Sequence, residues 1–178
     1  SAFGGKKILM TVFGIFISLS LLIVPPAFAK GPSAPAGKSN IAHLNLFQKN
    51  PSNWSIVPGG ANGKMTYNQS GSTFDYVFNG HGLQPDTGYS LIYYADPWPG
   101  SNPGALIANG TSNEGGNINL NGSNNLGTSI PNSVDVNYLA GGKIWLVLSS
   151  DYAANAMTAW NPTEYLFENN LINFTYIP

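Results

Sequence analysis

The sequence predicts an all-β fold: a two-sheet immunoglobulin-like β-sandwich of about eight or nine strands, preceded by an N-terminal hydrophobic signal helix. Apolar residues recur at every second position from residue 41 onward, as they do in half-buried strands. No segment there sustains the i, i+3, i+4 apolar spacing of a helix of usual length. Turn-forming residues separate the apolar runs at short intervals, which is typical of a sandwich built from many short strands.

The first residues predict an export segment. Lys6 and Lys7 form a short positive region before the apolar run Ile8–Val24, and Ala27-Phe28-Ala29 is a small-x-small cleavage site. Cleavage there predicts a mature chain that begins at Lys30. The alternative is an uncleaved anchor, because a run of 17 residues lies at the lower limit for spanning a bilayer. We therefore divide the chain into residues 1–29 as signal peptide or anchor, 30–40 as a flexible tether, and 41–178 as the β-sandwich domain.

The composition limits the classes of function. The chain has 178 residues, a formal net charge of −1 and only 8% charged side chains, against about 25% in soluble domains. So little positive charge excludes nucleic-acid binding. The absence of cysteine excludes disulfides, thiolate metal sites and thiol catalysis. An uncharged but polar composition on an exported chain predicts an extracellular or cell-surface protein, which meets the membrane only through an uncleaved N-terminal segment.

Each strand is predicted from its local pattern. Phe74, Tyr76 and Phe78 alternate with their neighbours as in a half-buried strand, and the continuously apolar Ile144–Leu148 predicts a central strand covered on both faces. The predicted strands are 41–48, 64–67, 72–79, 89–95, 105–108, 117–121, 143–149, 164–167 and 171–177. Turns are predicted at Pro58-Gly59-Gly60, Asn62-Gly63, Asn79-Gly80, Pro99-Gly100, Gly115-Gly116, Asn121-Gly122 and Gly141-Gly142.

One segment narrows the fold class. Leu83-Gln84-Pro85-Asp86-Thr87-Gly88-Tyr89 resembles the L-x-P-x-T-x-Y corner of fibronectin type III and related immunoglobulin-like domains. In those domains the tyrosine hydroxyl bonds back to nearby backbone as the chain crosses between sheets. The resemblance implies that Tyr89 is buried and that its hydroxyl bonds to the backbone near residues 84–86.

A second resemblance covers most of the domain. Four segments are similar to a group of uncharacterised secreted domains of methanogenic archaea and some bacteria. This resemblance implies secretion and a β-sandwich fold, and it implies no known activity. The segments are Phe78–Leu83, Asp96–Gly100, Gly142–Ser149 and Trp160–Glu168.

The exported chain carries several N-x-S/T sequons, which predict glycosylation if the source organism glycosylates its proteins. Asn109 and Asn121 are the strongest candidates because both precede glycine at a predicted turn, and Asn173 is the weakest because it lies inside a predicted strand. The five candidates are Asn53, Asn68, Asn109, Asn121 and Asn173.

Residues for catalysis are scarce, and we assign no catalytic residue and no cofactor. His43 lies in a predicted strand and His81 in a glycine-flanked turn, and no nucleophile-elbow motif accompanies them. Glu164 and Glu168 share one face of a predicted strand. Paired carboxylates of this kind hydrolyse glycosides, although they serve equally well as a solvated face.

Metal binding is also weakly indicated, and we predict no metal site. Asp135-Val136-Asn137 supplies oxygen ligands at alternate positions but lacks the third ligand and the closing glutamate of a calcium loop. Asp96 and Asp151 would join such a site only through the fold. Solvated turn residues are the simpler interpretation.

Several aromatic residues lie in or beside predicted loops. Trp98 stands between two prolines just after Tyr93 and Tyr94, and Trp54 and Trp160 each adjoin a loop. Exposed, rigid aromatic rings stack on sugars, so Trp98, Trp54 and Trp160 are candidates for carbohydrate binding. The alternative is that the tryptophans close the ends of the sandwich as part of its core.

The terminal strands suggest assembly. The tether precedes an apolar strand, Ile41–Phe47, and Asn169–Ile177 carries no charge, so neither strand has the charged side chains that usually protect sheet edges. Such strands pair with a neighbour's edge, with Leu44, Leu46 and Phe47 setting the register. The alternative is that both strands pair within one monomer.

Together these features predict a secreted cell-surface protein with a structural or adhesive role, as a subunit of an extracellular filament or surface layer. Its predicted partners are copies of itself, other surface proteins and glycans. A carbohydrate-binding module is the second hypothesis and a small hydrolase the third.

Overall fold

The computed structural model describes residues 39–97 and 104–178, and this part of the chain is all-β. The predicted signal segment, Trp98 and the predicted turn at Pro99-Gly100 lie outside the described residues. Within them, no helix is long and apolar enough to cross a bilayer. The strands are β1 (Ile41–Phe47), β2 (Asn62–Asn68), β3 (Ser70–Gly71), β4 (Phe74–His81), β5 (Gly88–Tyr94), β6 (Ala105–Thr111), β7 (Ile118–Asn124), β8 (Lys143–Leu148), β9 (Tyr152–Ala153), β10 (Ala156–Met157), β11 (Leu166–Glu168) and β12 (Thr175–Tyr176), with 3-10 turns η1 (Ser149–Asp151) and η2 (Pro162–Glu164).

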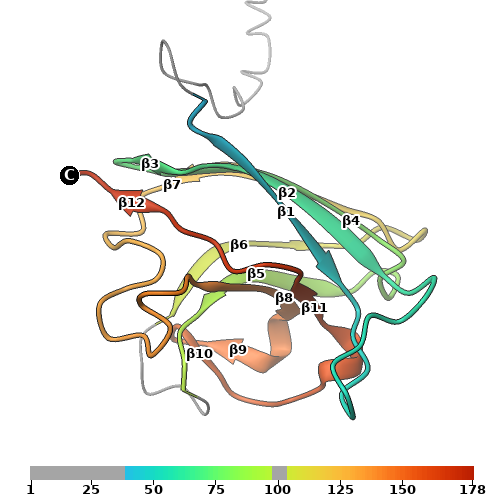
Figure 1. The fold of residues 1–178 in the computed structure, drawn as a ribbon. Coiled ribbons are helices and arrows are strands. Elements are labelled where there is room, and N and C mark those ends of the chain that lie inside the picture. Colours follow the sequence, from blue (N-terminus) through green and yellow to red (C-terminus); the bar gives the residue numbers. More distant parts are fainter. Residues whose placement is uncertain (1–38, 98–103) are drawn as a thin grey trace, which may run out of the picture.

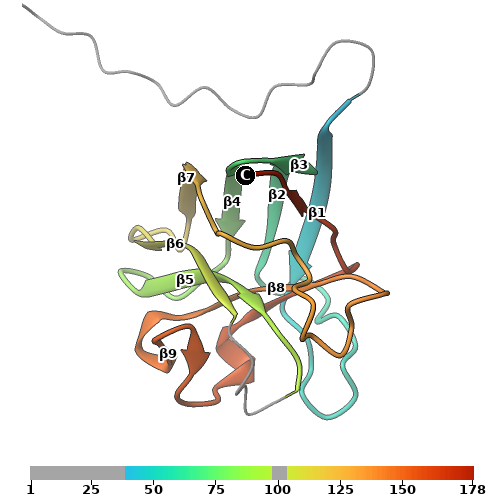
Figure 2. The same ribbon diagram turned by 90° about the vertical axis from the view of Figure 1, so that its left-hand side faces the viewer.

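Eight strands form one hydrogen-bonded sheet in the order β6-β5-β8-β11-β1-β2-β4-β7, and all neighbours are antiparallel. The sheet bends, so that β1, β2, β4 and β7 lie over β5, β6, β8 and β11 (Figures 1 and 2). A short pairing of β1 with β11, at Leu46–Glu168 and Phe47–Phe167, joins the two halves. The main core lies between them.

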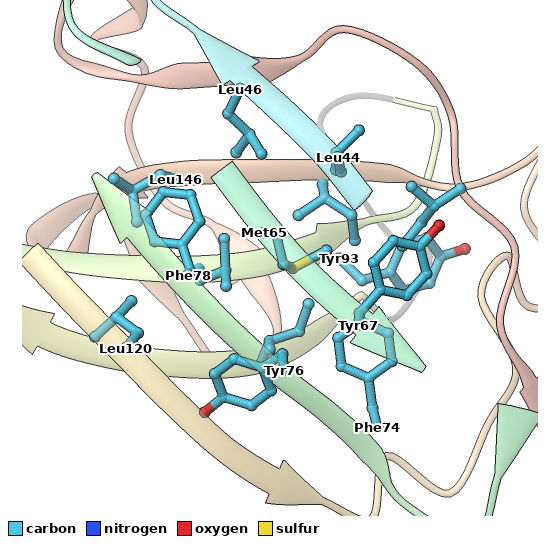
Figure 3. Close-up of a cluster of buried hydrophobic side chains, with 14 of the residues drawn as sticks. Leu44, Leu46, Met65, Tyr67, Phe74, Tyr76, Phe78, Tyr93, Leu120 and Leu146 are labelled. Atoms are coloured by element: carbon cyan, nitrogen blue, oxygen red, sulfur yellow. The ribbon is translucent and has the colours of Figure 1, made fainter. Parts of the chain in front are cut away.

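The predicted alternation produces this core. Phe74, Tyr76 and Phe78 on β4 are buried, as predicted, and lie on the same face of the sheet as Met65 on β2 and Leu120 on β7, the register partners of Phe78 (Figure 3). A fully buried side chain of this size contributes about 1.5–3 kcal/mol through the hydrophobic effect. The main core is therefore built mostly from strand residues at alternate positions, and residues of the connecting segments, such as Leu83, Ile130 and Phe174, complete it.

The prediction of a central strand at residues 144–148 is confirmed. β8 lies between β5 and β11, and its side chains are buried on both faces. Ile144 and Leu146 enter the main core, whereas Trp145 and Val147 enter a second core on the opposite face. The second core also contains Ile92, Tyr94, Met157, Tyr165 and Phe167.

Four predicted Asn-Gly turns are wrong, because Asn62-Gly63, Asn79-Gly80, Asn109-Gly110 and Asn121-Gly122 lie inside β2, β4, β6 and β7. Gly63 and Gly122 leave room for the aromatic side chains of the neighbouring strand β4. A Cβ at Gly63 would lie 2.4 Å from the Phe78 ring, and one at Gly122 would lie 2.8 Å from the Tyr76 hydroxyl. Large aromatic rings on β4 therefore require glycine on the strands beside them.

The predicted strands at the C-terminus are only partly correct. Glu164 belongs to η2, so the strand begins later, at Leu166. The last run forms a strand only at Thr175–Tyr176, which pairs in parallel with β3. Before it, Ile172 and Phe174 are buried and bridge to Gly142 and Ile130. Segment 171–177 therefore pairs with several different elements along its length and does not form one continuous strand.

The predicted burial of Tyr89 and the predicted hydrogen bond of its hydroxyl to nearby backbone are confirmed. Tyr89, at the start of β5, is 1% exposed, and its hydroxyl oxygen accepts a hydrogen bond of 3.1 Å from the backbone N–H of Gln84. Ser112 Oγ donates to the carbonyl of Gln84 and accepts from the N–H of Thr87. The corner therefore fixes the chain where it enters β5.

We predict that Tyr89→Phe lowers the free energy of unfolding by about 1 kcal/mol, and by up to about 3 kcal/mol if the Gln84 N–H is left without a partner. Urea unfolding monitored by fluorescence measures this difference. Tyr138→Phe, at a hydroxyl on an exposed side chain, is the control and should leave stability unchanged. A Tyr89→Phe variant as stable as the wild type would contradict the structural role of the corner.

Candidate functional site

A pocket of about 450 Å³ opens beside the second core. The strands β5, β8 and β11, which lie next to one another in the sheet (Figure 1), supply its base, and the loops after β1 and before η2 supply its rim. Its lining combines aromatic rings with two lysines and two carboxyl groups: Lys49, Trp54, Tyr94, Asp96, Lys143, Trp145, Trp160, Phe167 and Glu168.

The base of the pocket is a set of buried aromatic rings. Tyr94 and Trp145 stack with their ring centroids 4.0 Å apart and their planes at 10°. Phe167 contacts Trp145 edge-on at 5.2 Å, because the two residues are register partners on β11 and β8. Such contacts contribute about 0.5–1.5 kcal/mol beyond the area that they bury. The sheet therefore holds a rigid aromatic base in place.

Two tryptophans form the exposed rim. Trp54 is 50% exposed and Trp160 is 41% exposed, and their ring centroids lie 6.3 Å apart. Trp54 also meets Phe167 edge-on at 5.1 Å. Two of the three tryptophans predicted to bind sugars thus come together, and the third, Trp98, lies outside the described residues.

The loop that carries Trp54 holds it in an unusual backbone conformation. A bridge between Lys49 and Ile56 closes the loop, and the Trp54 N–H donates to the carbonyl of Asn50 at 2.7 Å. The φ angle of Trp54 is +59°. This left-handed conformation costs a residue with a Cβ about 1–2 kcal/mol. Strained residues of this kind gather at ligand-binding sites.

A buried carboxylate holds the loop that carries Trp160. Asp151 accepts hydrogen bonds from the Tyr165 hydroxyl and, at 2.9 Å, from Asn161 Nδ2. The Asn161 N–H in turn donates to the Tyr165 oxygen at 2.9 Å. The residue after Trp160 is therefore fixed from two sides. Asp151, considered above as a metal ligand, has this structural role.

Charged groups line one side of the pocket. Lys143 Nζ and Asp96 Oδ2 form an ion pair of 2.6 Å, and Asn137 Nδ2 also donates to Asp96. Lys49 Nζ donates to the backbone carbonyl of Glu168 at 2.8 Å. The pocket therefore offers an apolar stacking surface beside a cluster of hydrogen-bonding groups.

Glu168 is the least satisfied of these groups. Burial raises the pKa of its carboxyl to about 7, although Lys49, Lys143 and hydrogen bonds from its own backbone and from the Trp145 side chain act in the opposite direction. Its Oε2 is buried and has no hydrogen-bond partner among the described residues. Nearly all buried polar atoms have a partner, so this oxygen is an unsatisfied hydrogen-bonding group of a residue that lines the pocket.

The other residues considered for catalysis lie elsewhere. Glu164 lines a separate small pocket together with Tyr89, so the predicted pairing with Glu168 on one strand face is wrong. His43 and His81 are exposed and do not line the aromatic pocket. Their Nδ1 atoms hydrogen bond to Thr66 Oγ1 at 3.0 Å and Asn117 Oδ1 at 2.8 Å.

Asp135, considered for calcium, is also part of a hydrogen-bonded network. It is buried, and its carboxylate accepts hydrogen bonds from the Tyr93 hydroxyl at 2.6 Å and from the Asn137 N–H at 2.8 Å. Across the described residues, no three histidine, aspartate or glutamate side chains gather as a metal site would require.

The sequons differ in accessibility. Asn68 is buried and its side chain bonds to the backbone of Ser70, Thr73 and Asp75, so glycosylation of this asparagine is incompatible with the folded domain. Asn109 and Asn121 are exposed but lie inside β6 and β7, where turns were predicted. Asn53 and Asn173 are also exposed.

The residues considered for assembly lie within the monomer's own sheet. Leu44 and Leu46 are buried in the main core, and Phe47 is half-buried. β1 pairs with β2 over its whole length and with β11 at its end. This arrangement corresponds to the alternative in which the terminal strands pair within one chain.

Comparisons with protein-family models, with curated proteins and with solved structures find no match to this chain. The site is therefore defined by its own geometry. Sequence reasoning identified Trp54 and Trp160 as candidate binding residues but did not assign Lys49, Lys143 or Trp145 to a site. The continuously apolar run 144–148 is the signal that predicts a second buried face, and strand alternation then places Trp145 on the face opposite Ile144 and Leu146.

The strain at Trp54 gives a testable prediction. Trp54→Gly and Trp54→Ala both remove the ring, but only glycine adopts a positive φ without penalty. The free energy of unfolding of the glycine variant should therefore exceed that of the alanine variant by about 1 kcal/mol. Chemical denaturation of the two variants measures the difference. Equal stability, or a less stable glycine variant, would show that the loop is not strained at this position.

The buried carboxyl gives a pH prediction. Folded Glu168 keeps its proton up to about pH 7, whereas its ordinary pKa is 4.5. The folded state binds more protons than the unfolded chain across this range, so the contribution of Glu168 to stability is present below pH 4.5 and declines toward pH 7. The difference in unfolding free energy between wild type and Glu168→Gln should therefore change over this range, as measured by urea unfolding at several pH values. A constant difference for Glu168→Gln would contradict the shift.

Proposed function

We propose that this domain is an extracellular, adhesive carbohydrate-binding module of the cell surface, which takes a sugar ring against Trp54 and Trp160. The observation that carries the proposal is the convergence of two half-exposed tryptophans, an aromatic base and a polar edge in one pocket of about 450 Å³. Ligand pockets of about 300–1,000 Å³ are commonly lined by aromatic rings with a few polar groups that fix orientation.

The chemistry of sugars suits this lining. A pyranose ring presents C–H groups on its faces and hydroxyls around its edge. The tryptophan and tyrosine rings supply an apolar surface for a face of the sugar. Asp96, Lys143 and Glu168 supply acceptors and donors for its edge. The hydrolase hypothesis has less support, because Glu164 and Glu168 line different pockets.

The proposal includes secretion to the cell surface and adhesion to other surface proteins. The export segment predicted from the sequence supports secretion, and the uncharged composition supports an extracellular surface. Adhesion to other surface proteins is supported by the loop before β8, which exposes Val134, Val136, Tyr138 and Leu139. Contiguous exposed apolar residues are typical of interaction sites.

We also propose that the fold is immunoglobulin-like. If β2, β4, β5, β6, β7, β8 and β11 are taken as strands A to G, the pairs A–B, B–E, C–F and F–G of that fold are all present. The fourth strand, β6, pairs with β5 instead of β7, although it lies near β7. In this interpretation β1 is an additional strand between the last and the first.

Binding to a glycan array, followed by calorimetry with the best glycan, tests the proposed function. Trp54→Ala and Trp160→Ala should each weaken binding at least about tenfold, which corresponds to about 1.4 kcal/mol. Trp54→Phe keeps an aromatic face and should retain part of the affinity. Tyr138→Ala, at an exposed aromatic residue outside the pocket lining, should have no effect. A wild-type protein that binds no glycan, or an equal loss in Tyr138→Ala, would refute the proposal.

A further inference from the structure

We infer, on the basis of the carbohydrate-binding function proposed above, that the sugar taken by this pocket carries a carboxylate, as a uronic acid does. The carboxylate lies against the Lys49 ammonium and the Glu168 carboxyl, while the sugar ring lies against the tryptophans. The inference rests on the charges that line the pocket and on the unpartnered oxygen of Glu168.

The charges of the pocket lining do not balance when Glu168 is protonated. Four elements bring a charged group or a carboxyl: Lys49 follows β1, Asp96 follows β5, Lys143 lies on β8 and Glu168 ends β11. Tyr94 on β5 is also titratable, but burial raises the pKa of its hydroxyl, so it stays neutral. Asp96 and Lys143 form an ion pair, so their charges offset each other. Lys49 Nζ bonds to a neutral carbonyl. The positive charge of Lys49 therefore has no ionised counterpart within the lining while Glu168 holds its proton.

Glu168 supplies the second half of the argument. A protonated carboxyl donates through O–H, and a carboxylate only accepts. Because burial raises the pKa of Glu168 to about 7, the protonated form is well populated near neutral pH. Its buried Oε2 has no partner among the described residues. A ligand carboxylate would receive one hydrogen bond from this group and one from Lys49, and hydrogen bonds with one ionised partner are about twice as strong as neutral ones.

A uronic acid fits both parts of the pocket at once. Its carboxylate is attached directly to a ring carbon, so the apolar face of the ring and the negative charge lie within a few ångströms of each other. The pocket has the same arrangement, since the Glu168 carboxyl accepts a hydrogen bond from the side chain of Trp145, which contacts Phe167 edge-on at 5.2 Å. A neutral sugar would use the aromatic surface but would leave the charge of Lys49 unmatched.

The inference predicts a specific dependence on pH. Because the ligand carboxylate favours protonated Glu168, binding and proton uptake are linked, and the affinity should fall as the pH rises above about 7. A neutral sugar should bind with little dependence on pH. This difference separates charge recognition from simple stacking.

Calorimetry with methyl glucuronide and methyl glucoside, which differ in the carboxylate, tests the inference between pH 5.5 and 8.5. At pH 6 the wild type should bind the glucuronide at least about tenfold more tightly, equivalent to about 1.4 kcal/mol. Lys49→Met should remove this preference. Lys49→Gln keeps a hydrogen-bond donor without the charge and should remove it as well. Glu168→Gln should make the glucuronide affinity independent of pH, and Lys64→Met, at an exposed lysine on β2, should change nothing.

The outcomes are distinguishable. Equal affinity for the two sugars, or a preference that survives both Lys49 variants, overturns the inference and leaves carbohydrate binding intact. If the wild type binds neither sugar and no glycan on the array, both the inference and the proposed function are wrong. Urea unfolding of each variant identifies any loss of binding that results from a loss of folding.

Discussion

The burial of β8 on both faces is the constraint on which the rest of the structure depends. Ile144 and Leu146 are fixed in the main core, and the strand period of two then fixes Trp145 in the second core on the opposite face. A register shift of one residue would exchange the two sets, so the packing of the main core also determines the position of the pocket. Because Trp145 is the register partner of Phe167 on β11, the position of Phe167 in the second core is fixed in the same way. The aromatic base of the site is thus an extension of the core.

Much of the fold is predictable from the sequence because the two cores are built from local alternation. The buried residues of β4 and the tyrosine corner at Tyr89 follow from their own segments. The Asn-Gly pairs mislead, because the space that a neighbouring Phe78 or Tyr76 ring needs is a tertiary property. The site is only partly predictable. Trp54 and Trp160 adjoin predicted loops, but their approach to each other depends on how those loops fold over the second core.

Neutral tyrosine hydroxyls, instead of cations, hydrogen bond to the buried carboxylates of the loops around the pocket. Asp135 and Asp151 are both buried, and each accepts a hydrogen bond from a buried tyrosine, Tyr93 and Tyr165. Burial raises the pKa of both tyrosines, so each keeps the proton that it donates. An isolated buried charge is unfavourable unless it is hydrogen-bonded. In a chain with only 8% charged residues, these hydroxyls take the role that lysine or arginine has in other proteins.

Two locally unfavourable features lie in the aromatic pocket. The core follows the usual alternation of buried and exposed residues. Trp54, like Asp86, Ala154 and Asn155, adopts a left-handed backbone conformation, and Glu168 Oε2, like Tyr152 Oη, is buried without a hydrogen-bond partner among the described residues. Each feature is unfavourable for the folded state. Trp54 and Glu168 arise from separate parts of the chain and both line the aromatic pocket. Natural proteins usually break local folding rules where binding requires it. Their occurrence in one pocket, beside a rigid aromatic base, supports the proposal that binding takes place at this pocket and not at the edges of the sheet.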